Sequence, residues 1–444
     1  MFHETLAHCE TPLVGALPKR SPFGALFSRT LPAYAGQYPV GVRDVEVPIP
    51  RQSFGNFKHN SMPDGEAGIT IDTVMFTLFY PTELTLRSRG QMVWFPRLRQ
   101  TVDGLLKMSN KPYNWFYNTV AYGGVAAMIR GTTFPGIKDA PLKPPPESNK
   151  QWRLILFSHG AGSSRLMNSA VCGELASRGY VVAVIEHRDG TGPSSRITNE
   201  AGETKDLYWL NWSDLEWASF DLEEQPKDDA TLRHVQLEVR LAELEGIIEA
   251  LRRLARGEPL VLTGQTGLSR DWSGWDRMDV TNPIIGGHSF GGSLAMAAAA
   301  DGRFKFSHVV VFDPATQRLE PWNKCISAPL LAINSEEFAT GVEFTKLLAM
   351  APSAATHELY VIPGSTHPAF SDIFLILPNY VNKLFGLAAD PGRVIDLTID
   401  TTRRFLENEE DNTDRIVRHV SGSLTKGEVG DINSLVRCHR EDSV

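Results

Sequence analysis

The chain has 444 residues, of which 42% are hydrophobic, and this length suits one large α/β domain or about three average domains. With 44 Lys and Arg against 52 Asp and Glu, the formal net charge is −8, which argues against a general nucleic-acid binder. No apolar run has the length of a signal peptide or of a membrane-spanning helix, and the four cysteines form no CxxC pair. We therefore expect a reduced, cytoplasmic protein, with peripheral contact to membranes left open.

The N-terminal third predicts one clear strand. Residues 1–68 are rich in Gly, Pro and Ser, which predicts an irregular extension wrapped around a domain. From Ile69 to Tyr80 β-branched and aromatic residues dominate, which predicts a strand that ends at Pro81. Residues 93–130 then carry many aromatic side chains among Gly and Asn. Packing over a sheet edge is the favoured interpretation of this segment, and a lid or a lipid-facing rim is the alternative.

The middle of the chain predicts a parallel sheet. Short, largely apolar runs of the kind that form buried parallel strands span Leu154–Ser158, Val181–Ile185, Ile284–Gly286, Val309–Phe312, Leu330–Ile333 and Leu359–Ile362. Helical patterns separate these runs, and the clearest extends from Thr231 to Arg256 with leucines and isoleucines recurring on one face. Alternating strands and helices predict an α/β fold with a mostly parallel central sheet flanked by helices.

Two further segments do not fit this alternation. Residues 191–230 are polar and acidic, contain three tryptophans and are too long for an ordinary connection, which predicts a lid-like insertion beside the active face. Residues 409–444 are charged and show little periodicity, which predicts a polar, flexible tail. We therefore expect a single α/β domain at 69–408 between an N-terminal extension and this tail.

A nucleophile motif is the strongest chemical signal. The pentapeptide GHSFG at 287–291 follows an apolar strand and precedes an alanine-rich helix, which is the context of a nucleophile elbow. Such a sharp turn lifts the Ser289 hydroxyl clear of the sheet and places it near the positive end of the helix dipole. Ser289 is therefore the predicted nucleophile. The neighbouring His288 is interpreted as a packing residue of the elbow rather than a base.

A serine nucleophile needs a base. Five of the twelve histidines lie beyond Ser289, and only His367 follows the last apolar strand in a Gly-containing loop, PGSTHP at 363–368. The carboxyl ends of parallel strands are where ligands bind in such sheets. His367 is therefore the predicted general base.

The residues alone leave the orienting acid open. Asp313 ends the strand at 309–312, while Glu336 and Glu337 end the next strand along the chain, so either strand end faces the site. The shorter side chain of aspartate is more rigidly placed, which favours Asp313. The acid that does not serve is expected to cap a helix.

A tetrahedral oxyanion needs preorganised donors. The amide of Phe290, which follows the nucleophile, is the first predicted donor. The second is the amide of Ala161, in the His-Gly-x-Gly turn that ends the strand at 154–158. The Glu-His-Arg-Asp run at 186–189 ends another strand, and a salt-bridged structural cluster is the favoured interpretation over direct catalysis.

Five blocks of residues together resemble a known family. They are FSHGAG at 157–162, ELASRGYVVAVIEHRDG at 174–190, GGHSFGG at 286–292, AINSEEF at 332–338 and GSTHPAFSD at 364–372. In this order they are similar to the lipoprotein-associated and intracellular type II platelet-activating-factor acetylhydrolases, over roughly residues 70 to 408. The resemblance implies the α/β-hydrolase fold and selects Asp313 as the orienting acid.

The resemblance also implies an activity. It implies a calcium-independent serine esterase that removes short or oxidised sn-2 acyl groups from phospholipids, with Ser289, Asp313 and His367 as triad and the amides of Ala161 and Phe290 as oxyanion hole. No metal or organic cofactor is expected, and the expected partner is a phospholipid or another lipid ester. A broader carboxylesterase is the first alternative, and a non-catalytic member that binds lipid or protein is the second.

Overall fold

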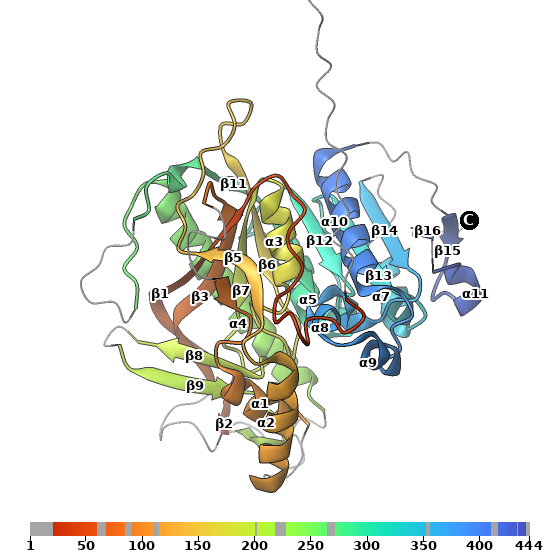
Figure 1. Cartoon of the computed structure of the whole chain (residues 1–444), viewed down its shortest axis with the longest axis horizontal. Coiled ribbons are helices and arrows are strands. Elements are labelled where there is room, and N and C mark those ends of the chain that lie inside the picture. Colours follow the sequence, from red (N-terminus) through yellow and green to blue (C-terminus); the bar gives the residue numbers. More distant parts are fainter. Residues whose placement is uncertain are drawn as a thin grey trace, which may run out of the picture.

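The computed structural model of the protein describes residues 21–59, 68–84, 91–109, 115–199, 202–217, 228–263, 271–351, 356–409, 416–432 and 434–440. A twelve-stranded sheet runs through the molecule, and helices lie against both of its faces (Figure 1). From one edge to the other the strand order is β15-β16-β14-β13-β12-β11-β6-β7-β3-β1-β5-β4.

The strands of this sheet, in chain order, are β1 (Val40–Phe54), β3 (Ile69–Pro81), β4 (Gln91–Val93), β5 (Thr133–Lys138), β6 (Trp152–Ser158), β7 (Tyr180–Glu186), β11 (Met278–His288), β12 (His308–Phe312), β13 (Leu330–Ser335), β14 (His357–Ile362), β15 (Ile416–Val420) and β16 (Val436–Arg440). Two small sheets pair β2 (Phe57–His59) with β10 (Leu215–Trp217), and β8 (Ser194–Thr198) with β9 (Thr204–Tyr208).

The six predicted strands form the centre of the sheet. Strands β14, β13, β12, β11, β6 and β7 are neighbours in this order, and every adjacent pair is parallel. The predicted parallel α/β sheet is therefore confirmed. Because parallel strands end at the same edge, the loops after Ser158, His288 and Phe312 meet there with the loops after Ser335 and Ile362.

Helices cover both faces of the sheet. The α-helices are α1 (Leu98–Met108), α2 (Trp115–Ile129), α3 (Ser169–Ser177), α4 (Ala230–Ala255), α5 (Phe290–Ala299), α6 (Glu336–Ala339), α7 (Val342–Met350), α8 (Ile373–Ile376), α9 (Asn379–Leu384), α10 (Pro391–Glu407) and α11 (Lys426–Val429). Short 3-10 helices are η1 (Trp212–Asp214), η2 (Trp275–Arg277), η3 (Thr316–Leu319) and η4 (His367–Phe370).

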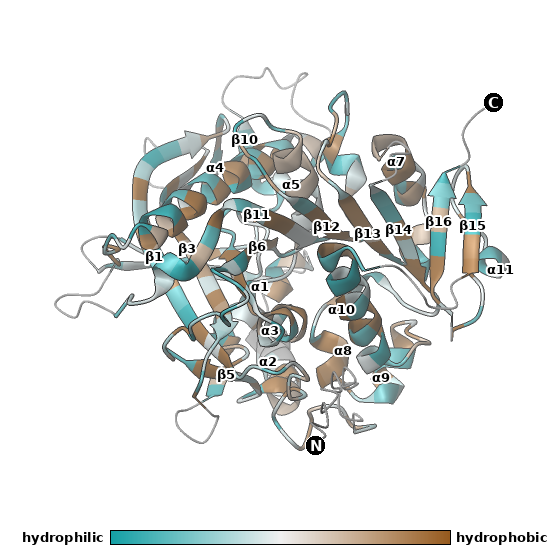
Figure 2. Ribbon diagram, turned by 90° about the horizontal axis from the view of Figure 1, so that it is seen from above, coloured by the Kyte–Doolittle hydropathy of each residue, from teal (hydrophilic) through white to brown (hydrophobic). Residues whose placement is uncertain are grey.

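Two apolar clusters separate these helices into layers. The first cluster packs α4, α5 and α7 on one face, and the second packs α3, α8 and α10 on the other (Figure 2). Helix α4 matches the amphipathic helix predicted at 231–256 to within one residue at each end. Its inward face contributes Leu244, Ile247 and Leu251, each without exposed surface, to the first cluster.

The predicted irregular N-terminal extension is wrong for residues 40–54. These residues form β1, which pairs antiparallel with β3 and parallel with β5 inside the main sheet. Val40, Val42, Val45 and Val47 are buried, so the strand carries its own apolar pattern. The register shifts between Pro48 and Gln52, where a proline cannot donate to the ladder.

The predicted flexible tail is wrong for much of its length. Strand β16 pairs antiparallel with β14, and β15 extends the sheet beyond it. Val436 and Cys438 are buried against β14, which explains why these residues are ordered in the fold. The C-terminal segment therefore covers the edge of the sheet beside the strand that leads to His367.

The predicted insertion at 191–230 contains regular structure. It holds the hairpin β8–β9, then η1, and β10, which pairs with β2 from the N-terminal region. Residues 218–227 lie outside the described residues. Trp217 packs on Phe57 with ring centroids 5.0 Å apart, so this part of the insertion is anchored to the body. Its predicted role as a lid remains a prediction.

The aromatic segment at 93–130 contains α1 and α2, which project from the body of the molecule (Figure 1), and its residues 110–114 lie outside the described residues. Trp94, just before α1, is fully buried and donates its indole N–H to Asp372, which fits the packing interpretation. By contrast, Leu105, Met108 and Val120 on the two helices are 38%, 41% and 57% exposed. Among the described helices, none joins sufficient length to sufficient apolarity to cross a bilayer.

Candidate active site

Ser289 occupies the predicted elbow between β11 and α5. Its φ of 57° and ψ of −122° lie in a region that non-glycine residues rarely adopt, and its N–H is held by the carbonyl of Phe312 at 2.9 Å. Close packing allows only glycine at two flanking positions: a Cβ at Gly287 would lie 2.3 Å from the backbone of Gly291, and one at Gly291 would lie 2.0 Å from the carbonyl of Ser158. The strand-to-helix turn therefore exposes the Ser289 hydroxyl to a cavity.

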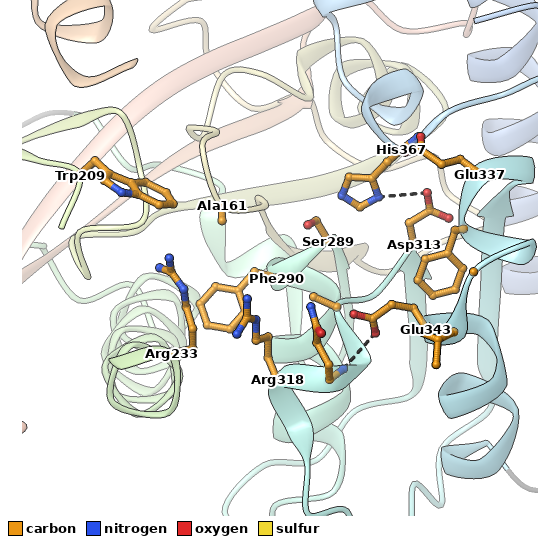
Figure 3. Close-up of a pocket in the computed structure, with 15 residues that line it drawn as sticks. Ala161, Trp209, Arg233, Ser289, Phe290, Asp313, Arg318, Glu337, Glu343 and His367 are labelled. Atoms are coloured by element: carbon orange, nitrogen blue, oxygen red, sulfur yellow. Dashed lines mark hydrogen bonds and ion pairs between the residues drawn. The ribbon is translucent and has the colours of Figure 1, made fainter. Parts of the chain in front are cut away.

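His367 and Asp313 meet beside this serine. The imidazole Nδ1 of His367 lies 3.1 Å from Oδ2 of Asp313, and Figure 3 shows the ring between Ser289 and Asp313. Asp313 is fully buried and accepts two hydrogen bonds from Ser335, one from its amide at 2.7 Å and one from its hydroxyl at 2.6 Å. These donors fix the carboxylate so that one oxygen faces the ring.

The electrostatic surroundings of His367 favour its protonated form. Partial burial acts against protonation, but the hydrogen bond and charge of Asp313 outweigh it, with further help from Glu337 and Glu343, and they raise the pKa of His367 above 6.5. An imidazole in this setting accepts a proton readily and stabilises the resulting positive charge.

The two competing acids make other contacts. Glu337 accepts a hydrogen bond from the backbone N–H of His367 at 2.9 Å, so it fixes the backbone at His367 and not the imidazole ring. Glu336 accepts from the amide of Gly364 at 2.8 Å. Both glutamates therefore stabilise the loop that carries His367, while Asp313 alone among the three contacts the imidazole.

His288, the residue before Ser289, also supports this loop. Its Nε2 lies 2.9 Å from the carbonyl oxygen of His367, and the two rings are 4.8 Å apart. Burial, then the neighbouring His367, lowers the pKa of His288 well below 6.5, so the neutral ring donates Nε2–H to that carbonyl. His288 therefore positions the predicted base, which is a more specific contact than the packing expected from the sequence.

The two predicted oxyanion donors lie on adjacent turns. Ala161 follows β6 and Phe290 follows Ser289, and both line the cavity that exposes the serine. Within the described part of the chain, neither amide donates to another residue, whereas the next amide, of Gly162, is bound to the carbonyl of Thr191 at 2.8 Å. Both N–H groups are thus free for a substrate oxygen.

A buried polar network lies behind these turns. Arg240 of α4 is fully buried, pairs with Asp189 at 2.7 Å and donates to the carbonyl of His159 at 2.8 Å. Its guanidinium also lies 4.4 Å from the ring centroid of Phe290. One side chain thereby contacts both turns that carry the predicted donors, and the sequence offered no motif that identifies it.

The Glu-His-Arg-Asp run at 186–189 belongs to the same network. Glu186 forms an ion pair with Arg165, and Arg188 with Glu46, in addition to the Asp189–Arg240 pair. Burial lowers the pKa of His187 well below 6.5, so its neutral ring is hydrogen-bonded to Glu243 through Nδ1 at 2.6 Å. None of these groups lines the cavity around Ser289. The arrangement agrees with the expected salt-bridged structural cluster.

Removing Arg240 should destabilise the fold. We expect Arg240→Met to lower the free energy of unfolding by roughly 3–5 kcal/mol, because Asp189 would remain buried without its partner. Urea unfolding followed by circular dichroism measures this change. The matched control is Arg303→Met, whose ion pair with Asp301 is exposed and should contribute about 1 kcal/mol or less. Equal effects of the two variants would contradict the structural role of Arg240.

The cavity itself has a volume of about 490 Å³. Besides the five predicted residues it is lined by polar and aromatic side chains from several distant segments, namely Trp209, Arg233, Gln317, Arg318, Glu337, Phe338 and Glu343 (Figure 3). Sequence reasoning considered Glu337 only as an alternative orienting acid and missed the others as site residues. Only the tryptophan density around Trp209 signalled that the insertion comes near the site.

Comparison with known proteins gives the family. The model of a family described as platelet-activating factor acetylhydrolase, isoform II, matches residues 24–424. The chain is 24% identical to a platelet-activating factor acetylhydrolase of Gallus gallus, over 67% of this chain and 72% of that protein. It is 26% identical to the protein of the same name from Canis lupus familiaris, over 74% and 70%.

A further relative and a solved structure are less similar to this chain in sequence. A putative phospholipase A2 of Schizosaccharomyces pombe is 22% identical over 86% of this chain and 93% of that protein. The structure of a ferulic acid esterase from Streptomyces cinnamoneus superposes with a TM-score of 0.51 at 17% identity, covering 85% of this chain and 92% of that chain, which supports the shared fold. Since the family model spans most of the sequence, the chain belongs to the platelet-activating factor acetylhydrolase isoform II family and has the α/β-hydrolase fold.

Proposed function

We propose that the protein is a calcium-independent serine esterase that hydrolyses short or oxidised sn-2 acyl groups of phospholipids. Ser289 is the nucleophile in this proposal, His367 the general base and Asp313 the orienting acid, with the amides of Ala161 and Phe290 as oxyanion hole. The observation that carries it is the Asp313–His367 hydrogen bond beside Ser289, in a chain whose relatives are named acetylhydrolases.

The proposed reaction has two acyl-transfer steps. His367 takes the hydroxyl proton of Ser289 as the serine oxygen attacks the ester carbonyl, and the oxyanion is held by the two amides. The protonated His367 then gives its proton to the leaving oxygen of the lysophospholipid. A water molecule, activated by the same imidazole, hydrolyses the acyl-enzyme and releases the carboxylic acid.

This mechanism predicts a pH dependence. His367 must be neutral to accept the proton, and its pKa is raised above 6.5 by Asp313 against the opposing effect of burial. As pH falls through this raised pKa the base becomes protonated, so kcat/KM should decline on the acidic side with a midpoint above pH 6.5. A pH profile of kcat/KM measures it. A midpoint at or below 6.5 would contradict the proposed environment of the base.

A substrate profile tests the proposed function. Purified protein is given a phosphatidylcholine with an sn-2 acetyl group, one with a long sn-2 chain, and a water-soluble ester without a lipid part. We expect the highest kcat/KM on the short-chain phospholipid, with and without a calcium chelator. An equal or higher value on the soluble ester would replace the proposal with a broader carboxylesterase, and no hydrolysis of any ester would favour a binding role.

Peripheral contact with lipid is proposed for the helices α1 and α2. Leu105, Met108 and Val120 expose apolar side chains there, and a net charge of −8 means that binding must depend on apolar contacts rather than on anionic lipid. We expect the triple replacement by Ser to reduce sedimentation with phosphatidylcholine vesicles. Unchanged binding by a folded variant would exclude this surface.

A cytoplasmic location is likewise a proposal. Cys172, Cys325 and Cys438 are free thiols, which fits a reducing compartment. Cys9 lies outside the described residues. Fractionation of cells that express the full chain, with a soluble and a membrane fraction, tests both the location and the peripheral contact.

A further inference from the structure

Two arginines face the cavity on the side of Ser289 away from His367. Arg233 comes from the first turn of α4 and Arg318 from η3, and Figure 3 shows both guanidinium groups beyond Ser289, with Trp209 nearby. These elements are far apart in the sequence and converge only in the fold. We call these two residues the arginine pair.

Both arginines form ion pairs with the same carboxylate, that of Asp229. Asp229 pairs with Nη1 of Arg318 at 2.8 Å through one oxygen and with Nε of Arg233 at 3.0 Å through the other. Among these three side chains, two positive charges therefore share one negative charge, which is an excess of one positive charge. The first turn of α4 adds the positive end of a 26-residue helix.

Some guanidinium N–H groups of the arginine pair can donate hydrogen bonds to a ligand. The Arg318 side chain is 26% exposed, and of its guanidinium nitrogens only Nη1 makes a hydrogen bond or ion pair within the described residues. Arg233 is more fixed: its Nη1 donates to Gln236 at 2.7 Å and its guanidinium lies 4.9 Å from the ring centroid of Trp209. Arg318 is thus the adaptable member of the pair and Arg233 the rigid one.

The acids of the cavity are occupied with other contacts. Glu343 accepts from the hydroxyl of Thr316 and from the amide of Gln317 at 2.9 Å, and Glu337 accepts from the amide of His367. Asp313 is bound to Ser335 and His367. None of them pairs with the arginines in the described structure, so the positive charge at the opposite wall is left for a ligand.

We infer that the arginine pair binds the phosphodiester of a glycerophospholipid while its sn-2 ester lies at Ser289. This inference rests on the proposed function and adds the group that selects a phospholipid over a neutral ester. A phosphodiester carries one negative charge, which is equal and opposite to the excess charge of the arginine pair with Asp229. Its two non-bridging oxygens match the fork of donors that a guanidinium offers.

The test compares two substrates that differ in the phosphate. One is a 1-alkyl-2-acetyl-glycerophosphocholine, and the other is the 1-alkyl-2-acetylglycerol with the same ester and no head group, both below their aggregation limits. For the wild type we expect a higher kcat/KM on the phospholipid. In Arg318→Gln the ratio of the two values should fall about 10- to 100-fold, mainly through a higher KM on the phospholipid.

Two further variants complete the test. Arg318→Lys keeps the charge but loses the fork, so its ratio should lie between those of the wild type and Arg318→Gln. Arg303→Gln is the matched control, because Arg303 is an exposed arginine that pairs with Asp301 and Glu245 and does not line the cavity. Its ratio should equal that of the wild type.

The outcomes separate this inference from the function on which it rests. A wild type that prefers the phospholipid, together with an Arg318→Gln variant whose ratio is unchanged, overturns the role of the arginine pair and leaves the proposed function standing. A wild type that hydrolyses only the neutral ester overturns both. A ratio that falls equally in Arg303→Gln also overturns the inference, since the loss would then follow from removing any arginine.

Discussion

Ser289→Ala should lower kcat on the short-chain phospholipid by about 10⁴-fold or more. In the proposed mechanism the hydroxyl oxygen forms the acyl-enzyme bond, and no other nucleophile described in the cavity can replace it from the elbow position. Substrate binding should change little, because the methylene group remains and the arginine pair is untouched. Steady-state kinetics on the wild type and on Ser289→Ala measure the change in kcat and in KM.

A serine-directed fluorophosphonate gives a second measurement. The wild type should be labelled at Ser289 and the alanine variant should not. The matched control is Ser293→Ala, because Ser293 lies one helical turn further along α5 and its hydroxyl donates to the carbonyl of Ala315 rather than to the cavity. Labelling of Ser289→Ala to the same extent as the wild type would place the nucleophile elsewhere.

Asp313→Asn should have the second largest effect, a loss of about 10⁴-fold in kcat. In the proposed mechanism the carboxylate accepts a hydrogen bond from Nδ1–H of His367, which leaves Nε2 free to take the proton of Ser289. An amide at this position can instead donate to Nδ1 and fix the wrong tautomer of the ring. The Ser335 amide, which donates to Oδ1, can still donate to the carbonyl oxygen of the asparagine and keep the side chain in place, whereas the Ser335 hydroxyl loses its acceptor at the Oδ2 position. We therefore expect the loss of kcat to come mainly from the catalytic step and the loss of stability to be smaller.

Glu337→Gln is the matched comparison for this acid. Within the described residues, the Glu337 carboxylate accepts a hydrogen bond from the backbone N–H of His367 and from no other group. A glutamine carbonyl can accept the same bond, so we expect a loss below about tenfold. Similar losses in the two variants, or a larger one in Glu337→Gln, would mean that the ring is oriented from the glutamate and not from Asp313.

The sequence was sufficient to predict the central sheet but not its edges. The six parallel strands are buried on both faces, so each is a nearly continuous apolar run. The strand β1 was missed because Gly41 and Pro48 interrupt an alternation that is otherwise clear. The strands β15 and β16 were missed because they are short and carry charged and histidine residues, as strands near a sheet edge commonly do.

The candidate site was likewise predicted from the sequence only in part. Ser289 and His367 follow strands in loops with recognisable residues, so local pattern was enough to nominate them. The choice between Asp313 and Glu337 depends on which carboxylate contacts the imidazole of His367. That contact is made between segments that are separate in sequence, so no local pattern encodes it. Arg240 and the arginine pair carry no motif, because their contacts are made between segments that are distant in sequence.

The backbone at Ser289 carries a consequence for stability. A φ of 57° with a ψ of −122° strains any residue with a Cβ, at a cost of about 1–3 kcal/mol, and glycine is largely free of it. We therefore expect Ser289→Gly to be inactive and yet to unfold at a higher urea concentration than Ser289→Ala. The reverse order in urea unfolding would mean that the turn is relaxed in solution. At position 289 the residue that suits the backbone is thus one that cannot carry out catalysis, so stability and activity favour different amino acids at the same position.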